Sequence, residues 1–172
     1  WRMFGDAYLN INPFKGFNIR TTFGLDYSQK QQRIFTYPVT EGNVANSKNG
    51  VEAKQEHWTK WMWNAVATYN MELGKNSIDL MAGMELNRED DINFSGYKEG
   101  FSILNPDYMG PDAGTTNPQA YGGGSGYSLV SFFGKANYNY ADKYMASFTI
   151  RRDGSSRFGK NNRYATFPSI SV

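Results

Sequence analysis

The sequence contains no cysteine and only one histidine, His57. Without cysteine, the chain has neither a disulfide framework nor a thiolate that binds metal or attacks a substrate. Serine-type catalysis would depend entirely on His57, which we interpret as a surface residue beside Trp58 at the start of a strand. We therefore expect no catalytic residue, no metal site and no cofactor.

Long apolar runs and a strong net charge are also missing. No window approaches the roughly 18 apolar residues of a transmembrane helix, which excludes that kind of span. A transmembrane β-strand is not excluded, because it needs only about 10 residues of alternating polarity. The net charge is +2 and the basic residues are scattered, so we expect no nucleic acid partner. No charged and apolar leader opens the sequence, so we expect no signal peptide in residues 1–172.

Aromatic residues, in contrast, make up 16% of the chain, and apolar and polar residues alternate along most of it. A period of two places alternate side chains on opposite faces of a strand, and the pattern predicts about seven strands. The predicted connections alternate in length along the chain. The short ones are residues 12–16, 74–77 and 141–143, and the long ones are residues 37–56, 89–127 and 153–163.

This pattern predicts an all-β fold, an antiparallel up-and-down meander with short turns at one edge and long loops at the other. Such asymmetry is typical of outer-membrane barrels, and aromatic residues near both strand ends match their interfacial belts. We therefore expect part of a large transmembrane β-barrel. The start at Trp1 and the end inside a strand pattern suggest a piece of a longer protein.

The last two complete strands of the prediction separate their side chains most clearly. We expect the apolar face to meet lipid and the polar face to line the barrel lumen. The residues expected to face lipid are Val130, Phe132, Tyr138, Phe148 and Ile150. The residues expected to face the lumen are Lys135, Asn137, Ser147, Thr149, Arg151 and Asp153.

Four short motifs follow one another in the same region. They are GKANY at 134–138, DKY at 142–144, RRDGSSRFG at 151–159 and FPS at 167–169. With these spacings the region resembles the SusC/RagA family of TonB-dependent outer-membrane transporters of Bacteroidetes. The N-terminal part of the chain resembles the middle of the family's barrel more loosely.

The resemblance implies a 22-stranded barrel with an N-terminal plug and a TonB box, in the cell outer membrane. Residues 1–172 would be a single segment of that barrel, without a plug domain. The implied function is active import of a bulky nutrient, a glycan or a peptide. The implied partners are outer-membrane lipid, a SusD-like surface lipoprotein that acts as a lid, and TonB, which would bind through an N-terminal part absent from this chain.

Loops 37–56 and 89–127, together with the aromatic residues Trp58 and Tyr121, are the expected contacts for substrate or lid. Arg151 and Asp153 are expected to form charge-assisted bonds with each other or with the plug. The alternative for these two is ordinary turn chemistry around an Asp-Gly pair.

Two other functions remain open. In a soluble carbohydrate-binding β-sandwich, exposed aromatic residues would stack on sugar rings: Trp58, Trp61, Trp63 and Tyr121. In a β-sheet hydrolase, Glu85 and Glu89 would form a carboxylate pair, which the lack of a defined spacing argues against.

Two further motifs are interpreted as ordinary loops. The first is a group of acidic residues that calcium would suit, but whose spacing matches no EF-hand: Glu89, Asp90, Asp91 and Glu99. The second is the glycine run at 122–126, which lacks the Gly-Lys-Ser/Thr end of a phosphate-binding loop.

Overall fold

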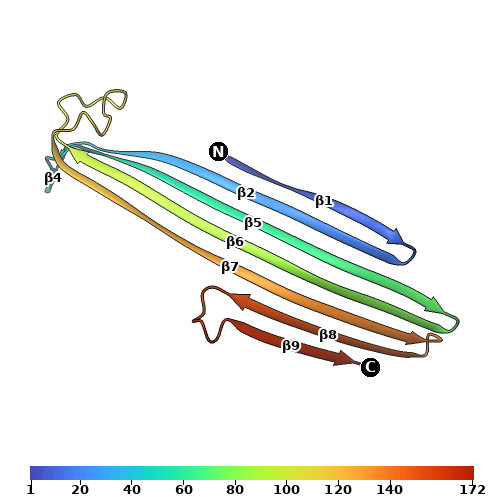
Figure 1. Ribbon diagram of the computed structural model, residues 1–172. Helices are drawn as coiled ribbons and strands as arrows, with labels where there is room; N and C mark the ends of the chain where they lie inside the picture. Colours follow the sequence, from blue (N-terminus) through green and yellow to red (C-terminus); the bar gives the residue numbers. More distant parts are fainter. The chain divides into compact units, whose positions relative to one another are not determined.

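The computed structural model describes the backbone of residues 1–172 and every side chain except that of Val44. Seven antiparallel strands lie side by side in chain order (Figure 1). They are β1 (Arg2–Phe14), β2 (Phe17–Thr36), β5 (Gly50–Leu73), β6 (Asn76–Glu99), β7 (Thr116–Tyr140), β8 (Tyr144–Ser155) and β9 (Tyr164–Ser171). The predicted all-β meander is confirmed. In the described part of the chain, no helix is long and apolar enough to cross a membrane.

The two longest predicted loops are shorter in the structure than the sequence pattern indicated. Within 37–56, β3 (Val39–Glu41) pairs with β4 (Val44–Asn46), and β5 already begins at Gly50. Within 89–127, β6 continues to Glu99 and β7 begins at Thr116, so only residues 100–115 connect them. Most residues of these strand ends are polar or glycine. The apolar ones, Val51, Ile92 and Phe94, form runs too short to be recognised as alternation in the sequence.

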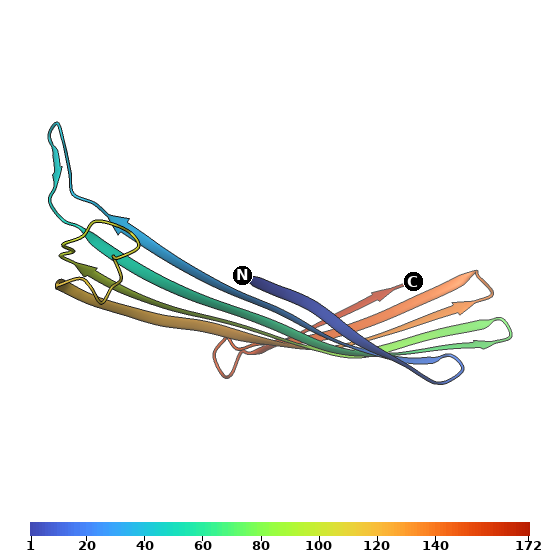
Figure 2. The same cartoon turned by 90° about the horizontal axis from the view of Figure 1, so that it is seen from above.

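The chain divides into two compact units, and several strands contribute to both. Unit 1 consists of Trp1–Arg2, Tyr27–Trp58 and Asp90–Ser125. Unit 2 consists of Met3–Asp26, Thr59–Glu89 and Gly126–Val172. Unit 1 therefore holds the β3–β4 hairpin, which extends away from its other strands (Figure 2), and unit 2 holds the short turns.

In unit 1, the connection 100–115 folds back onto the strands around a small apolar core. Val51 and Met109 are fully buried, and Phe101 and Phe35 pack against them. The Asn49 side chain fixes the start of this connection, because its Oδ1 accepts the Phe101 N–H at 2.7 Å and its Nδ2 donates to the Phe101 carbonyl at 2.9 Å. One amide thus occupies both hydrogen-bonding groups of Phe101, as a neighbouring strand would.

In unit 2, the register of β7, β8 and β9 is regular. Lys135 lies opposite Thr149, and Tyr138 lies opposite Ala146. Phe148, on the same side as Tyr138, lies opposite Ile170 of β9. Cross-strand partners share a face, so the two predicted sets, apolar and polar, lie on opposite sides of these strands.

Aromatic residues gather at the short turns of unit 2. Phe14 stacks on Phe17 with 5.0 Å between ring centroids, and Tyr69 of β5 lies 6.0 Å from Phe14. At the turn between β7 and β8, the rings of Tyr140 and Tyr144 are 6.5 Å apart. These contacts place amphipathic and apolar rings together at one end of the strands.

Candidate functional site

A cavity of about 400 Å³ lies in unit 2, where the chain leaves β8 and returns into β9. We call it the arginine-loop pocket. Its polar lining consists of Glu85, Asn87, Ser131, Arg151, Asp153, Ser155, Asn162, Arg163 and Tyr164. This volume falls within the range of about 300–1,000 Å³ that is usual for ligand-binding pockets.

Arg151 organises the polar side of the arginine-loop pocket. Its Nε donates to both carboxylate oxygens of Asp153, at 2.8 and 3.0 Å, and its Nη2 donates to Ser131 Oγ at 3.1 Å. Ser131 is only 6% exposed, and the guanidinium lies 5.9 Å from the centre of the Phe133 ring. The structure thus brings Arg151 and Asp153 together and holds the guanidinium in one orientation.

Two aromatic side chains of the pocket remain largely exposed. Phe158 is 61% exposed and Phe167 is 56% exposed, although both line the cavity. Nearby, Asn87 Nδ2 donates to Glu85 Oε1 at 2.6 Å. Fixed donors and acceptors beside accessible rings suit a ligand that carries hydroxyl or amide groups on an otherwise apolar body.

A second polar arrangement, in unit 1, is a chain of hydrogen bonds that we call the Glu99 ladder. The Tyr121 hydroxyl donates to Gln119 at 2.7 Å, and Gln119 donates to Asn117 at 3.0 Å. Asn117 and the Tyr97 hydroxyl then donate to the same Glu99 oxygen, at 3.0 and 2.9 Å. Residues two apart on each strand share a face, so this face presents a row of polar groups.

The ladder changes the acidity of two of its members. Hydrogen bonds from Asn117 and Tyr97, and the nearby Lys48 ammonium, hold the pKa of Glu99 below its ordinary value. Burial and the hydrogen bond to Glu99 raise the pKa of Tyr97 above its ordinary value. The ionised carboxylate of Glu99 is therefore the form that the folded ladder stabilises.

Because the pKa of Glu99 is lowered in the folded state, its contribution to stability is present above the ordinary pKa and is lost as the pH falls through the folded value. Replacement of Asn117 by Ala is expected to raise the pKa of Glu99 and to move this loss to higher pH. Amide hydrogen exchange of residues 97–99 and 116–121 across the acidic range, corrected for intrinsic rates, measures the pH at which this stability is lost. Asn76→Ala in unit 2 is the control, and equal midpoints in the two variants would contradict the assignment.

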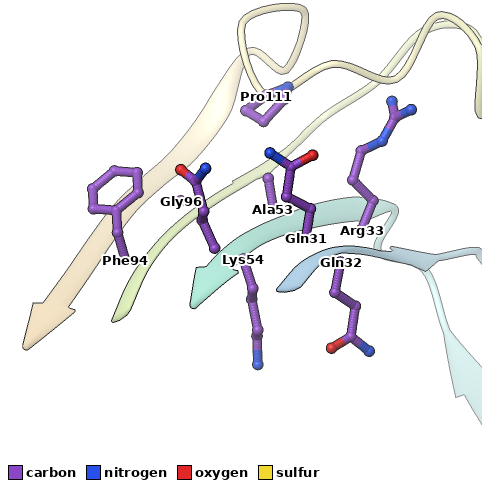
Figure 3. A pocket seen from close by; sticks show the side chains of 9 residues that line it. Gln31, Gln32, Arg33, Ala53, Lys54, Phe94, Gly96 and Pro111 are labelled. Carbon is purple, nitrogen blue, oxygen red and sulfur yellow. The ribbon is translucent and has the colours of Figure 1, made fainter. Parts of the chain in front are cut away.

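A pocket of about 620 Å³ lies on the other face of unit 1. Gln31 and Arg33 lie on the same side of the strands as Pro111, whereas Gln32 and Lys54 point to the opposite side (Figure 3). Pro111 belongs to the connection 100–115. The pocket is therefore the space that this connection leaves when it packs on the strands, and no convergent set of charges marks it as a binding site.

The structure places Trp58 and Tyr121 in β5 and β7, so the prediction that Tyr121 belongs to a loop is wrong. Trp58 lies 5.9 Å below the Arg2 guanidinium, and Tyr121 is 58% exposed while it bonds to Gln119. The glycine run at 122–126, which was also predicted as a loop, is part of β7 as well. Both aromatic residues belong to unit 1.

Other predicted candidates are not gathered into a reactive site. His57 Nδ1 lies 3.0 Å from the Tyr27 hydroxyl. Glu89 accepts a hydrogen bond from Tyr127 at 3.0 Å. The acidic residues around Glu89 are spread along β6, and among the residues that the structure describes no group of three or more His, Asp or Glu side chains is arranged to hold a metal ion.

Phe158, Phe167 and Asn87 line the arginine-loop pocket but were not among the predicted site residues. The alternation along β6 and β9 places Asn87 and Phe167 on the polar side of the sheet. The sequence pattern could therefore have indicated that these two residues lie on the side of the pocket. For Phe158, which lies in the loop after β8, the sequence holds no periodic signal.

No protein-family model matches the chain. Two curated relatives match nearly all of it. TonB-dependent receptor SusC of Bacteroides thetaiotaomicron is 32% identical over 154 residues, which cover 90% of this chain and 15% of the relative. TonB-dependent receptor P3 of Formosa agariphila is 34% identical over 160 residues, which cover 91% of this chain and 16% of the relative. The chain thus spans about a sixth of the length of these relatives.

Solved structures agree in fold. The structure of the RagAB peptide transporter matches with a TM-score of 0.83 at 22% identity, over 98% of this chain and 20% of its own. The RagAB peptide importer in its closed-closed state matches with a TM-score of 0.84 at 23% identity, over 98% of this chain and 19% of its own. At these identities the matches show a common strand arrangement.

Proposed function

This chain is a SusC/RagA-like part of a TonB-dependent receptor, and we propose that the full-length receptor imports a bulky nutrient, a glycan or a peptide, across the cell outer membrane. The observation that carries the proposal is the sorting of side chains on β7, β8 and β9. The predicted apolar set, together with Arg152, occupies one side of these strands, and the predicted polar set, Phe167 and the arginine-loop pocket occupy the other. This is the distribution that a strand between lipid and a water-filled lumen requires.

In this proposal Val130, Phe132, Tyr138, Phe148 and Ile150 face lipid. The polar set faces the lumen: Lys135, Asn137, Ser147, Thr149, Arg151 and Asp153. Substrate in the lumen meets the arginine-loop pocket, where Arg151, Asp153 and Glu85 offer hydrogen bonds and Phe158 offers apolar contact. Import then needs no covalent chemistry by these residues.

In this proposal, the energy for import and the capture of the substrate come from partners outside the chain. The family resemblance supports coupling to TonB through an N-terminal part and closure by a SusD-like surface lipoprotein. Exposed polar groups of the Glu99 ladder, with Trp58 and Tyr121, are candidates for contact with substrate or with that lipoprotein.

The contacts of two tryptophans favour the barrel over a soluble carbohydrate-binding sandwich. Trp63 Nε1 donates to Thr21 at 2.9 Å, and the Trp61 ring stacks with Phe23 at 6.4 Å. Both indoles thus contact β2 on the apolar side of the strands, the side that faces lipid in the barrel interpretation. A freely soluble full-length protein, extracted without detergent, would favour the sandwich instead.

Single cysteines introduced into a full-length receptor from which any native cysteines have been removed test the orientation directly, and residues 1–172 contain none. Thr149→Cys and Arg151→Cys are expected to react with a charged, water-soluble maleimide added to intact cells. Phe148→Cys and Ile150→Cys are expected to react only with a lipid-soluble reagent. These residues alternate on β8, so the labelling pattern should alternate as well.

Labelling of Arg151→Cys by the lipid-soluble but not by the charged reagent would overturn this orientation. Uptake of a fluorescent maltooligosaccharide and of a fluorescent peptide, in cells with and without TonB, tests the transport function separately.

A further inference from the structure

The apolar side of unit 2 ends in a groove of about 270 Å³. At one end of the groove lie Trp61, Leu86 and Val130. Two residues further along β7, towards the loop end, Ser128 replaces the apolar side chains. Arg163 and Tyr164, which also line the arginine-loop pocket, complete this end of the groove. Along the strands, the lining thus changes from apolar to polar and cationic residues over a short distance, as at a membrane–water interface.

Arg152 adds a second guanidinium next to this groove. On β8 it follows Phe148 and Ile150 on the same side, so it is the first charged residue after an apolar run. Its guanidinium lies 4.9 Å from the centre of the Tyr164 ring. Arg88 also lines the groove, and among the described lining residues none is a carboxylate, although Asp90 follows Arg88 two positions later.

Gly154 fixes the position of the Tyr164 ring. Gly154 is buried, and a Cβ there would collide with Tyr164 and would lie 3.0 Å from Val130 Cγ1. The ring therefore lies against bare backbone, between Val130 on one side and Arg152 on the other. This packing holds an aromatic ring and a guanidinium at the same level of the strands.

We propose that this groove binds the phosphorylated headgroup of a lipid in the outer leaflet of the membrane. Arg152 and Arg163 bind the phosphate, because guanidinium groups match its geometry in bidentate pairs. Tyr164 and Trp61 lie at headgroup depth, and Val130 and Leu86 contact the first part of the acyl chains. The inference depends on the proposed function, since it requires that this side of the strands faces lipid.

The test uses the full-length receptor in nanodiscs that contain either lipid A with its phosphates or the same lipid after dephosphorylation. Native mass spectrometry after release from the nanodisc counts the lipid molecules that stay bound. The phosphorylated lipid is expected to be retained about tenfold more than the dephosphorylated one, as loss of charge-assisted hydrogen bonds implies. This comparison needs no variant and so does not depend on the folding of a mutant.

The double variant Arg152→Gln and Arg163→Gln is expected to lose the preference, and Arg152→Lys with Arg163→Lys to keep part of it. Arg157→Gln is the matched control, because Arg157 belongs to the same loop but lies over Tyr127, 4.1 Å from its ring centre. Tyr127 bonds to Glu89 rather than to any residue of the groove.

Equal retention of the two lipids by the wild-type receptor, or an unchanged preference in the double glutamine variant, would overturn the lipid site. A receptor that stays in solution without detergent would overturn the proposed function itself. The two failures are therefore distinguishable.

Discussion

Gly16→Ala is expected to lower the free energy of unfolding by about 3 kcal/mol, whereas Gly74→Ala should lower it by only about 1 kcal/mol. Both glycines lie in short turns with positive φ, +82° at Gly16 and +58° at Gly74. At Gly74 an added Cβ meets nothing within 4 Å. At Gly16 it would collide with the backbone carbonyl of Asn70 in β5.

The collision at Gly16 also breaks a hydrogen bond. The Asn70 N–H donates to the Gly16 carbonyl at 2.8 Å, so the turn between β1 and β2 is attached to β5 at this point. A shift that relieves the collision lengthens this bond. Backbone strain is common to both variants, and the difference between them therefore isolates the contact with Asn70.

Urea unfolding of the full-length receptor in detergent micelles, followed by tryptophan fluorescence, measures both variants against wild type. Equal losses at Gly16 and Gly74 would show that backbone strain is the whole effect. The difference should appear in the midpoint and not in the slope of the transition.

Phe158→Ala should weaken substrate binding by about thirtyfold, or about 2 kcal/mol, which is the usual effect of truncating an aromatic anchor at a binding site. Phe158 lines the arginine-loop pocket and is 61% exposed, so its ring is available to a ligand. Its backbone N–H bonds to the Ser155 carbonyl at 3.4 Å, and replacement of the side chain by Ala keeps this bond available. Its loss should therefore affect binding more than folding.

Initial rates of TonB-dependent uptake, measured over a range of maltooligosaccharide and peptide concentrations, show whether the half-saturating concentration rises. Phe158→Tyr keeps the ring and should behave like wild type. If Phe158→Ala transports both probes with unchanged half-saturation, the pocket does not contact substrate and the loop has only a structural role.

The strands of unit 2 were predictable because one face of each is apolar. Phe148 and Ile150 alternate with Ser147 and Thr149, and that period alone separates the faces. Between Glu89 and Glu99, most residues of β6 are polar, and Ile92 with Phe94 forms too short a period to indicate the strand, although the hydrogen-bonded ladder continues. Backbone hydrogen bonds hold such a segment in the sheet, and these bonds produce no recognisable pattern of residues in a single sequence.

The candidate site was also predictable only in part. The position of Arg151 and Asp153 on one face follows from their spacing of two on β8. The place of Phe158 depends on the loop after β8, where Ser156 N–H bonds to the Ser128 carbonyl at 3.0 Å. That bond joins residues 28 positions apart, as does the bond from Ser128 N–H to Ser156 Oγ at 2.8 Å, and no local pattern indicates such a contact.

The attachment of the connection 100–115 by Asn49 makes this segment a suitable carrier for an inserted tag. Two of its residues, the anchors Phe101 and Met109, are buried, whereas Ile103 and Leu104 between them are exposed. An epitope inserted between Ile103 and Leu104 would leave the anchors in place and would project from the protein, where an antibody could bind it.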